Sequence, residues 1–166
     1  MSALSKGASL PASKLRAVIS PEAADAVVQR LAASRKSGRA LRMEAMRALS
    51  KLPLYEWSGV YRLEGDELHL DEYVGEATDH TVIPVGRGVC GTAVAERRSQ
   101  VVEDVRALDN YLSCSARTRS EVVVLIERDG QILGQIDIDG WEVGAFDPSD
   151  EAFLRRIAAI LADRWD

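Results

Sequence analysis

Hydrophobic positions spaced three and four residues apart predict two helices near the start of the chain. The first spans about 20–38, with Ser20 as its N-cap, and the second spans about 39–52, where Pro53 ends it. Residues 1–19 mix small and polar side chains without a period, so we predict a flexible N-terminal tail there.

After the second helix the pattern changes to alternating apolar and polar positions, which is typical of β-strands. The turn dipeptides Gly65-Asp66 and Asp129-Gly130 each separate two such stretches, and each predicts a β-hairpin. The four predicted strands are 58–63 and 68–74, then 121–127 and 132–138.

The segment between the two hairpins has a weaker pattern. A loop punctuated by glycines at 83–88 leads into a short predicted helix at about 91–97, and Val101-Val102 indicates a brief strand. Residues 104–119 show no clear period, so we predict a loop with one helical turn.

A final helix begins at Pro148, with Asp147 as its N-cap and an apolar stripe along one side. Hairpins in the middle of the chain and helices at both ends predict the α+β fold class, an antiparallel β-sheet with helices packed on one face. We expect one domain over 20–166, because 166 residues suit a single hydrophobic core.

Composition narrows the class of protein further. Apolar residues make up 46% of the chain and charged residues 28%, which excludes a disordered chain, a collagen or a coiled coil. The longest apolar run, 122–126, is far too short to span a membrane, so we expect no membrane insertion. The first twenty residues contain no secretory signal, which predicts the cytoplasm, where a structural disulfide is not expected.

Charge is distributed unevenly along the chain. Residues 1–52 hold ten Lys and Arg against three Asp and Glu, whereas 53–166 hold eleven against twenty-three. The basic residues are spread through the helices and the body is acidic, so we do not expect nucleic-acid binding. We expect the basic helices to dock on the acidic body, within one chain or across a dimer.

The two cysteines are either buried thiols without a chemical task or reactive ones. Cys90 lies in GVCGTA, between glycines and at a helix start, where the helix dipole and backbone N–H groups favour a thiolate. Cys114 lies in SCSARTR, where Arg117 and Arg119 bring positive charge to a polar loop, a setting that suits a nucleophile.

A metal site or cofactor is not predicted. Cys90, Cys114, His69 and His80 form a Cys₂His₂ set, but no two of them have the short spacing of a zinc motif. The DxDG sequence at 137–140 lacks the remaining ligand positions of a calcium loop.

The carboxylates Asp137 and Asp139 are two residues apart on a predicted strand, so they project from one face. They mark either a solvated strand face or a site. Glu121 begins the partner strand, and the turn decides its side. A strict two-residue turn at Asp129-Gly130 would put Glu121 on the opposite face, whereas a loop of three or five residues would put it beside the aspartates.

The order of these residues resembles the GAF-domain free methionine-(R)-sulfoxide reductases. The resemblance rests on IPVGRGVCGTAVAERRSQVVEDV, on Cys114 twenty-four residues after Cys90, and on RSEVVVLI and GQILGQIDIDG. It extends from about Trp57 to the final helix, about two-thirds of the chain. It implies a GAF-like antiparallel sheet with helices behind it, a small closed pocket and a homodimer packed through N-terminal helices.

The resemblance also implies a role for each candidate residue. Cys114 matches the thiol that attacks the sulfoxide sulfur and becomes a sulfenic acid, and Cys90 matches the family's middle cysteine. The acids that hold the substrate's amino group and sulfoxide oxygen match Glu121, Asp137 and Asp139. The aromatic wall around the methyl group matches Trp57 and Tyr61.

One position departs from the family pattern in a way that affects turnover. The family's first cysteine, ten residues before the middle one, resolves the sulfenic acid into a disulfide that thioredoxin reduces, and here that position is His80. Ser115 replaces an acidic neighbour of Cys114, and Gly140-Trp141 replaces smaller polar residues. Cys90 or an external thiol must then resolve the sulfenic acid, or turnover is lost.

Two functions remain open on the sequence alone. The first is thiol-dependent reduction of free methionine-(R)-sulfoxide, with thioredoxin or another thiol as reductant. The second is a non-catalytic GAF sensor domain that binds a small amino-acid-like ligand and has lost the resolving cysteine. His80 separates them, because only the enzyme needs a route from sulfenic acid back to thiol.

Overall fold

A computed structural model describes residues 19–112 and 115–166. The predicted tail, apart from Ile19, and Cys114 lie outside the described residues. The elements follow in the order α1 (Pro21–Ala33), α2 (Gly38–Leu49), β1 (Trp57–Glu64), β2 (Glu67–Val74), β3 (Val82–Pro84), α3 (Gly88–Glu96), β4 (Gln100–Val102), the 3₁₀ turn η1 (Val105–Ala107), β5 (Ser120–Arg128), β6 (Gln131–Gly140) and α4 (Pro148–Asp163).

The strands form one six-stranded sheet in the order β3-β2-β1-β6-β5-β4, and every neighbouring pair is antiparallel. The two predicted hairpins are β1–β2 and β5–β6, and they lie side by side at the centre of the sheet. The predicted α+β fold class is confirmed.

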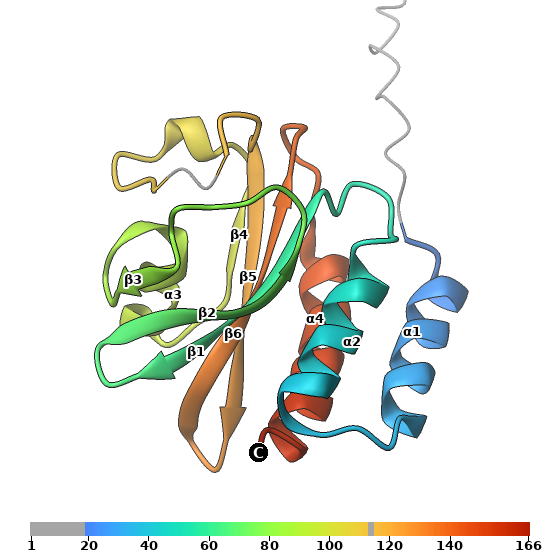
Figure 1. Ribbon diagram of the computed structural model, residues 1–166. Helices are drawn as coiled ribbons and strands as arrows, with labels where there is room; N and C mark the ends of the chain where they lie inside the picture. The colour runs from blue at the N-terminus through green and yellow to red at the C-terminus, as the bar shows by residue number, and fades with distance from the viewer. Residues whose placement is uncertain (1–18, 113–114) are drawn as a thin grey trace, which may run out of the picture.

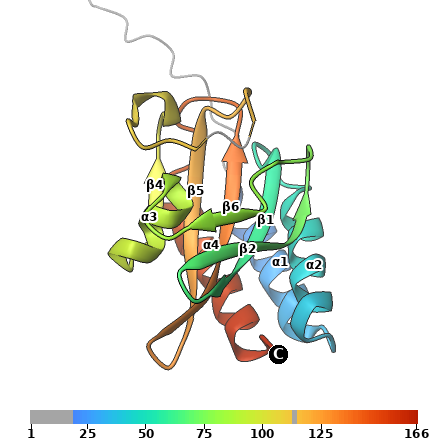
Figure 2. The same cartoon turned by 60° about the vertical axis from the view of Figure 1, so that its left-hand side comes forward.

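The sheet carries a hydrophobic core on each face. On one face α1, α2 and α4 pack against strand residues such as Val60, Val124 and Ile138, as predicted (Figure 1). The short helix α3 covers the opposite face, where Val89, Ala93 and neighbouring residues pack against the sheet (Figure 2). The sheet is therefore covered on both sides, and residues that alternate along a strand enter two different environments.

The register of the β5–β6 hairpin places Glu121 directly opposite Asp139. The turn itself has two residues, because Arg128 pairs with Gln131 and both turn residues have positive φ, as a type I′ turn requires. A β-bulge follows, in which β6 has one additional residue, Leu133. The rule that loop length alone decides the side of Glu121 was therefore wrong, since the bulge shifts the register by one residue.

The basic second helix docks on the acidic body of the same chain, which is one of the two arrangements expected from the charge distribution. Arg42 on α2 is 5% exposed and donates from Nε to Asp71 Oδ2 at 2.6 Å. Its guanidinium also donates to the Trp165 carbonyl oxygen at 2.5 Å and lies 4.4 Å from the centre of that indole ring. Arg39 forms a second ion pair with Glu72. These contacts tie α2 to β2 and to the C-terminus.

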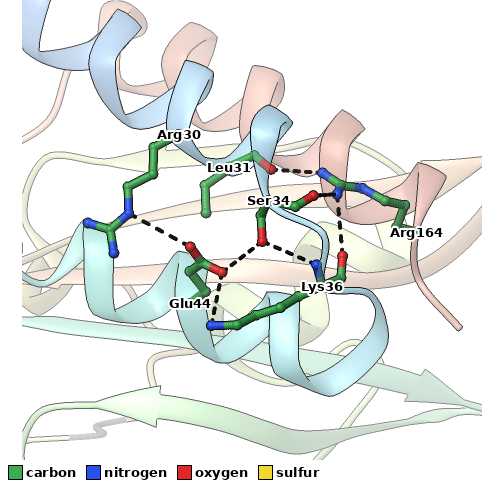
Figure 3. Close-up of polar contacts among 6 residues, drawn as sticks. All are labelled: Arg30, Leu31, Ser34, Lys36, Glu44 and Arg164. Carbon is green, nitrogen blue, oxygen red and sulfur yellow. Dashed lines mark hydrogen bonds and ion pairs between the residues drawn. The ribbon is translucent and has the colours of Figure 1, made fainter.

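The first helix ends earlier than predicted, at Ala33 and not near Gly38. Arg164 binds the last turn and the segment after it, because its guanidinium donates to the carbonyl oxygens of Leu31 at 2.8 Å, of Lys36 at 3.3 Å and of Ser34 (Figure 3). Glu44 on α2 accepts a hydrogen bond from the Ser34 hydroxyl at 2.9 Å and pairs with Lys36 at 3.2 Å. A tertiary contact 130 residues away in sequence therefore sets this boundary.

Two further differences surround Cys90. The segment predicted as a loop contains β3, which extends the sheet by pairing with β2. Helix α3 begins at Gly88, three residues before the predicted start, so Cys90 lies inside the first helical turn. None of the helices in the described ranges has the length and apolar character of a membrane span.

Candidate active site

Three carboxyl groups lie buried on the face of the sheet that α3 covers. Glu121 begins β5, and Asp137 and Asp139 alternate along β6, so the register brings all three to one face. Their residues are 3%, 0% and 1% exposed. Carboxyl groups are rarely buried so completely unless a partner compensates them, which makes this cluster the first candidate for a binding site.

Cys90 approaches this cluster from α3. Its thiol donates to Asp137 Oδ2 at 3.3 Å and to Glu121 Oε1 at 3.7 Å. The close approach depends on the next residue, Gly91, because a Cβ there would lie 2.5 Å from the carbonyl oxygen of Pro84. The glycine therefore lets α3 pack tightly enough for Cys90 to reach the carboxyls.

Trp57 and Tyr61 project from β1 on the same face, opposite Asp139 and Gln135 respectively. The Trp57 ring lies over Gly59, where a Cβ would be 2.2 Å from the indole, and it stacks on Tyr73 with ring centres 5.6 Å apart. Tyr61 is fully buried. The two residues thus share the sheet face of the carboxyl cluster, and their role as the wall of a substrate pocket stays a prediction.

Burial dominates the ionisation of the cluster. It raises the pKa of Asp137 to about 6. It raises the pKa of Glu121 well above the usual range, and the charges of Asp137 and then Asp139 add to this shift. The pKa of Asp139 is also well raised, by burial and then by the charge of Asp137. Burial and the mutual repulsion of the three acids therefore favour the protonated forms of Glu121 and Asp139.

Several polar atoms of the cluster have no hydrogen-bond partner within the described residues. They are Asp137 Oδ1, both carboxyl oxygens of Asp139 and both amide atoms of Gln135. Thr118 lies close enough to lower the pKa of Asp139 slightly, but its hydroxyl makes no hydrogen bond of normal geometry there. Buried polar groups without partners are costly to a fold, and the four oxygens among these atoms suit a ligand with several N–H donors.

The rim beside the cluster is held by Glu76. Its carbonyl oxygen accepts from Trp57 Nε1 at 3.0 Å, and its carboxylate accepts from the Ser115 hydroxyl at 3.2 Å. The same carboxylate lies 3.3 Å from Arg117, whose guanidinium covers the Trp141 ring at 4.8 Å. Ser115 and Trp141, two of the positions that depart from the family pattern, therefore both belong to this rim.

Comparison with known proteins agrees with this geometry. The chain matches the GAF domain family over residues 22–165. The chain belongs to the GAF domain family. This GAF domain is 44% identical over 105 residues to the free methionine-R-sulfoxide reductase of Escherichia coli, a match that covers 63% of each chain. The chain thus spans less than two-thirds of that relative's length.

Solved structures resemble this GAF domain over more of their length. The fRMsr of Staphylococcus aureus, solved in complex with substrate, is 34% identical with a TM-score of 0.81, covering 90% of this chain and 99% of that one. The free methionine-R-sulfoxide reductase of Neisseria meningitidis, also solved with its substrate, is 33% identical with a TM-score of 0.79, covering 87% and 86%. The resemblance inferred from the sequence is confirmed.

The remaining candidate residues are Cys114, His80 and His69. Cys114 lies outside the described residues, so its relation to the cluster stays a prediction. His80 is half-buried, and its carbonyl oxygen accepts from the Tyr61 hydroxyl at 3.0 Å, so its backbone borders the site of this GAF domain. His69 pairs instead with Glu67 at 3.2 Å near the β1–β2 turn.

Sequence reasoning missed two residues of the site. Gln135 is fully buried and shares the face of Asp137 and Asp139, and the alternation Gln135, Asp137, Asp139 was the signal for it. Glu76 had no sequence signal, because its role depends on contacts with Trp57 and Ser115 from other segments.

Proposed function

We propose that this GAF domain reduces free methionine-(R)-sulfoxide to methionine, with a thiol as the electron donor. The observation that carries the proposal is the set of three buried carboxyl groups beneath Cys90, with acceptor oxygens still unpaired inside the described structure. A free amino acid has an ammonium group that such a set can hold. Relatives that are named free methionine-R-sulfoxide reductases support the same substrate.

The pKa shifts of the three acids suggest which of them binds the ammonium group and which donate a proton. Asp137 carries the negative charge near neutral pH and is assigned to the ammonium group of the substrate. Glu121 and Asp139, whose pKa values are well raised by burial and neighbouring charge, are assigned to donate a proton to the sulfoxide oxygen. The resemblance assigns Trp57 and Tyr61 to the substrate's methyl group.

Cys114 is assigned the role of nucleophile. Its thiolate attacks the sulfoxide sulfur, the oxygen is protonated, and the products are methionine and a sulfenic acid on Cys114. A second thiol then attacks the sulfenic sulfur and releases water as a disulfide forms. Cys90 or an external thiol supplies that second sulfur, because His80 stands at the family's resolving position. Thioredoxin or another thiol reductant returns the disulfide to two thiols.

The setting of the reaction is proposed on the same resemblance. We expect a cytoplasmic homodimer that requires no cofactor and no nucleic acid. The N-terminal helices are the expected dimer contact.

The test is NADPH consumption coupled to thioredoxin reductase and thioredoxin, with separated R and S epimers of free methionine sulfoxide. The R epimer should be consumed and the S epimer should not. Cys114→Ser should abolish turnover, and Asp137→Asn should weaken substrate binding. Equal rates with both epimers would contradict the proposal, as would full activity in Cys114→Ser.

A second candidate is a non-catalytic GAF module that binds an amino-acid-like ligand, and His80 favours it because a binding module needs no resolving thiol. Calorimetric titration separates the two functions. Binding of free methionine-(R)-sulfoxide with no turnover under any thiol reductant would support the module. Turnover would exclude it.

A further inference from the structure

We propose that Cys90, Glu121 and Asp137 form a binding site for one thiophilic divalent cation, of which Zn²⁺ is the representative. The ligand atoms would be Cys90 Sγ and one carboxylate oxygen from each acid. These three atoms lie within 4.8 Å of one another, and all three residues are buried. The site draws on one helix and two strands and includes no histidine, so it differs from the Cys₂His₂ set considered from sequence.

The distances match what a tetrahedral zinc ion requires. Zinc bonds of about 2.3 Å to sulfur and about 2.0 Å to oxygen at a tetrahedral angle separate sulfur from oxygen by about 3.5 Å. Cys90 Sγ lies 3.3 Å from Asp137 Oδ2 and 3.7 Å from Glu121 Oε1, one value on each side of that separation. Both sulfur-to-oxygen distances therefore suit a tetrahedral zinc ion.

A fourth residue independently points to a cation. Asp139 is 1% exposed, lies directly opposite Glu121 in the β5–β6 register, and has no hydrogen-bond partner for either carboxyl oxygen within the described residues. Asp137 Oδ1 is likewise without a partner. These oxygens supply either a further ligand or the outer hydrogen bonds that orient a metal-bound water.

Charge balance also favours a divalent ion. As metal ligands, Cys90, Glu121 and Asp137 are a thiolate and two carboxylates, so binding releases any protons that they hold. A 2+ charge compensates such a buried group better than the single charge of an ammonium ion. The sulfur ligand selects Zn²⁺ or Co²⁺ over Mg²⁺ and Ca²⁺, which prefer oxygen ligands.

A small cavity borders two of the ligands. It is lined by Ile83, Arg87, Leu112 and the start of α3, and its wall includes both Cys90 and Glu121.

Cobalt and zinc titrations test the site directly. One equivalent of Co²⁺ per chain should produce the sulfur-to-cobalt charge-transfer band in the near ultraviolet, and one equivalent of Zn²⁺ should remove it. Cys90→Ser should abolish the band and weaken Zn²⁺ binding more than about 100-fold, beyond the effect of losing an outer-shell partner. The matched control Cys114→Ser should retain the band.

Three results would overturn the proposal: no binding, a band that persists in Cys90→Ser, or a band that Cys114→Ser removes. Circular dichroism establishes that each variant is folded. Glu121→Gln provides a second probe, because it keeps the thiol and should retain the band with weaker affinity. Unchanged affinity in a folded Glu121→Gln variant would also overturn the site.

One consequence rests on the proposed function, because that function gives the same carboxyls to the substrate's ammonium group. Free methionine-(R)-sulfoxide should then raise the apparent Kd for Zn²⁺ in Cys114→Ser, where no turnover consumes it. Zinc binding that ignores the sulfoxide would leave the metal site intact and refute the substrate placement. Competition with no metal-dependent thiolate band would refute the metal site.

Discussion

Replacing Asp137 with asparagine should change how the stability of the protein depends on pH. Burial raises the pKa of Asp137 from 3.8 to about 6, so between these values the carboxyl is ionised in the unfolded chain and protonated in the folded one. Its contribution to stability is fully present below the lower value and is lost as the pH rises through the upper one. The loss is about 1.4 kcal/mol per pH unit and about 3 kcal/mol in total.

Urea denaturation followed by tryptophan fluorescence measures this loss. The free energy of unfolding of Asp137→Asn minus that of the wild type should rise by about 2–3 kcal/mol between about pH 4 and pH 7.5. Effects of the substitution that do not depend on pH, such as a weaker bond with Cys90, cancel in this difference. The charge of Asp137 also raises the pKa of Glu121 and Asp139, so its removal shifts the result in the same direction.

The control is Asp66→Asn, an acid exposed in the β1–β2 turn. No burial penalty applies to that side chain, so its stability difference from wild type should change little with pH. A difference for Asp137→Asn that is equal at both pH values would refute the reasoning, because it would mean that the carboxyl titrates alike in both states.

Three other changes have outcomes that can be measured. Arg164→Met should lower the free energy of unfolding by about 2 kcal/mol, because it removes charged donors from three carbonyl oxygens. The control Arg155→Met removes only an exposed ion pair and should lower it by at most about 0.5 kcal/mol. Equal losses in the two variants would contradict this prediction. Peptide mapping after one turnover without reductant should find a Cys90–Cys114 disulfide if Cys90 resolves the sulfenic acid, and a persistent sulfenic acid on Cys114 would instead indicate an external thiol. His80→Cys should raise thioredoxin-dependent turnover with little change in substrate affinity, and an unchanged rate would argue against a redox role for this position.

Most of the fold was predicted from local sequence signals, and the structure contains the corresponding caps and turns. Ser20 and Asp147 cap the helices predicted for them, since each side chain accepts a backbone hydrogen bond in the first turn. The two hairpins form at their turn dipeptides because Gly65, Asp129 and Gly130 adopt the positive φ that such turns need. These features depend on a few neighbouring residues, which is why sequence suffices for them.

The differences arose where distant contacts decide the outcome. The end of α1 depends on Arg164, and strand β3 exists because residues 82–84 pair with the start of β2. In both cases the contacting residues are distant in sequence, so no local pattern predicts the contact. The same reason explains why Glu76 was missed at the rim of the site.

The sequence predicted which acids form the site but not the structural reason that they come together. The alternation of Asp137 and Asp139 showed that they share a face, and the family resemblance added Glu121. The turn alone would have excluded Glu121, because a bulge leaves no clear mark on the hydrophobic pattern. The cluster is buried because α3 covers it, and the place of α3 on the sheet could not be predicted from the sequence.

The bulge at Leu133 sets which residues of the β5–β6 hairpin face each other. Glu121 and Asp139 are paired because three of the residues between them, the two turn residues and Leu133, have no partner across the hairpin. Residues added to the turn can loop out without moving a pair, since anchors on the other face such as Val122 and Ile138 hold the register. Loss of the bulge at unchanged chain length would instead pair Glu121 with Ile138 and place Glu121 on the opposite face. A substitution near Leu133 that flattens the bulge can thus abolish the site while every residue in it is preserved.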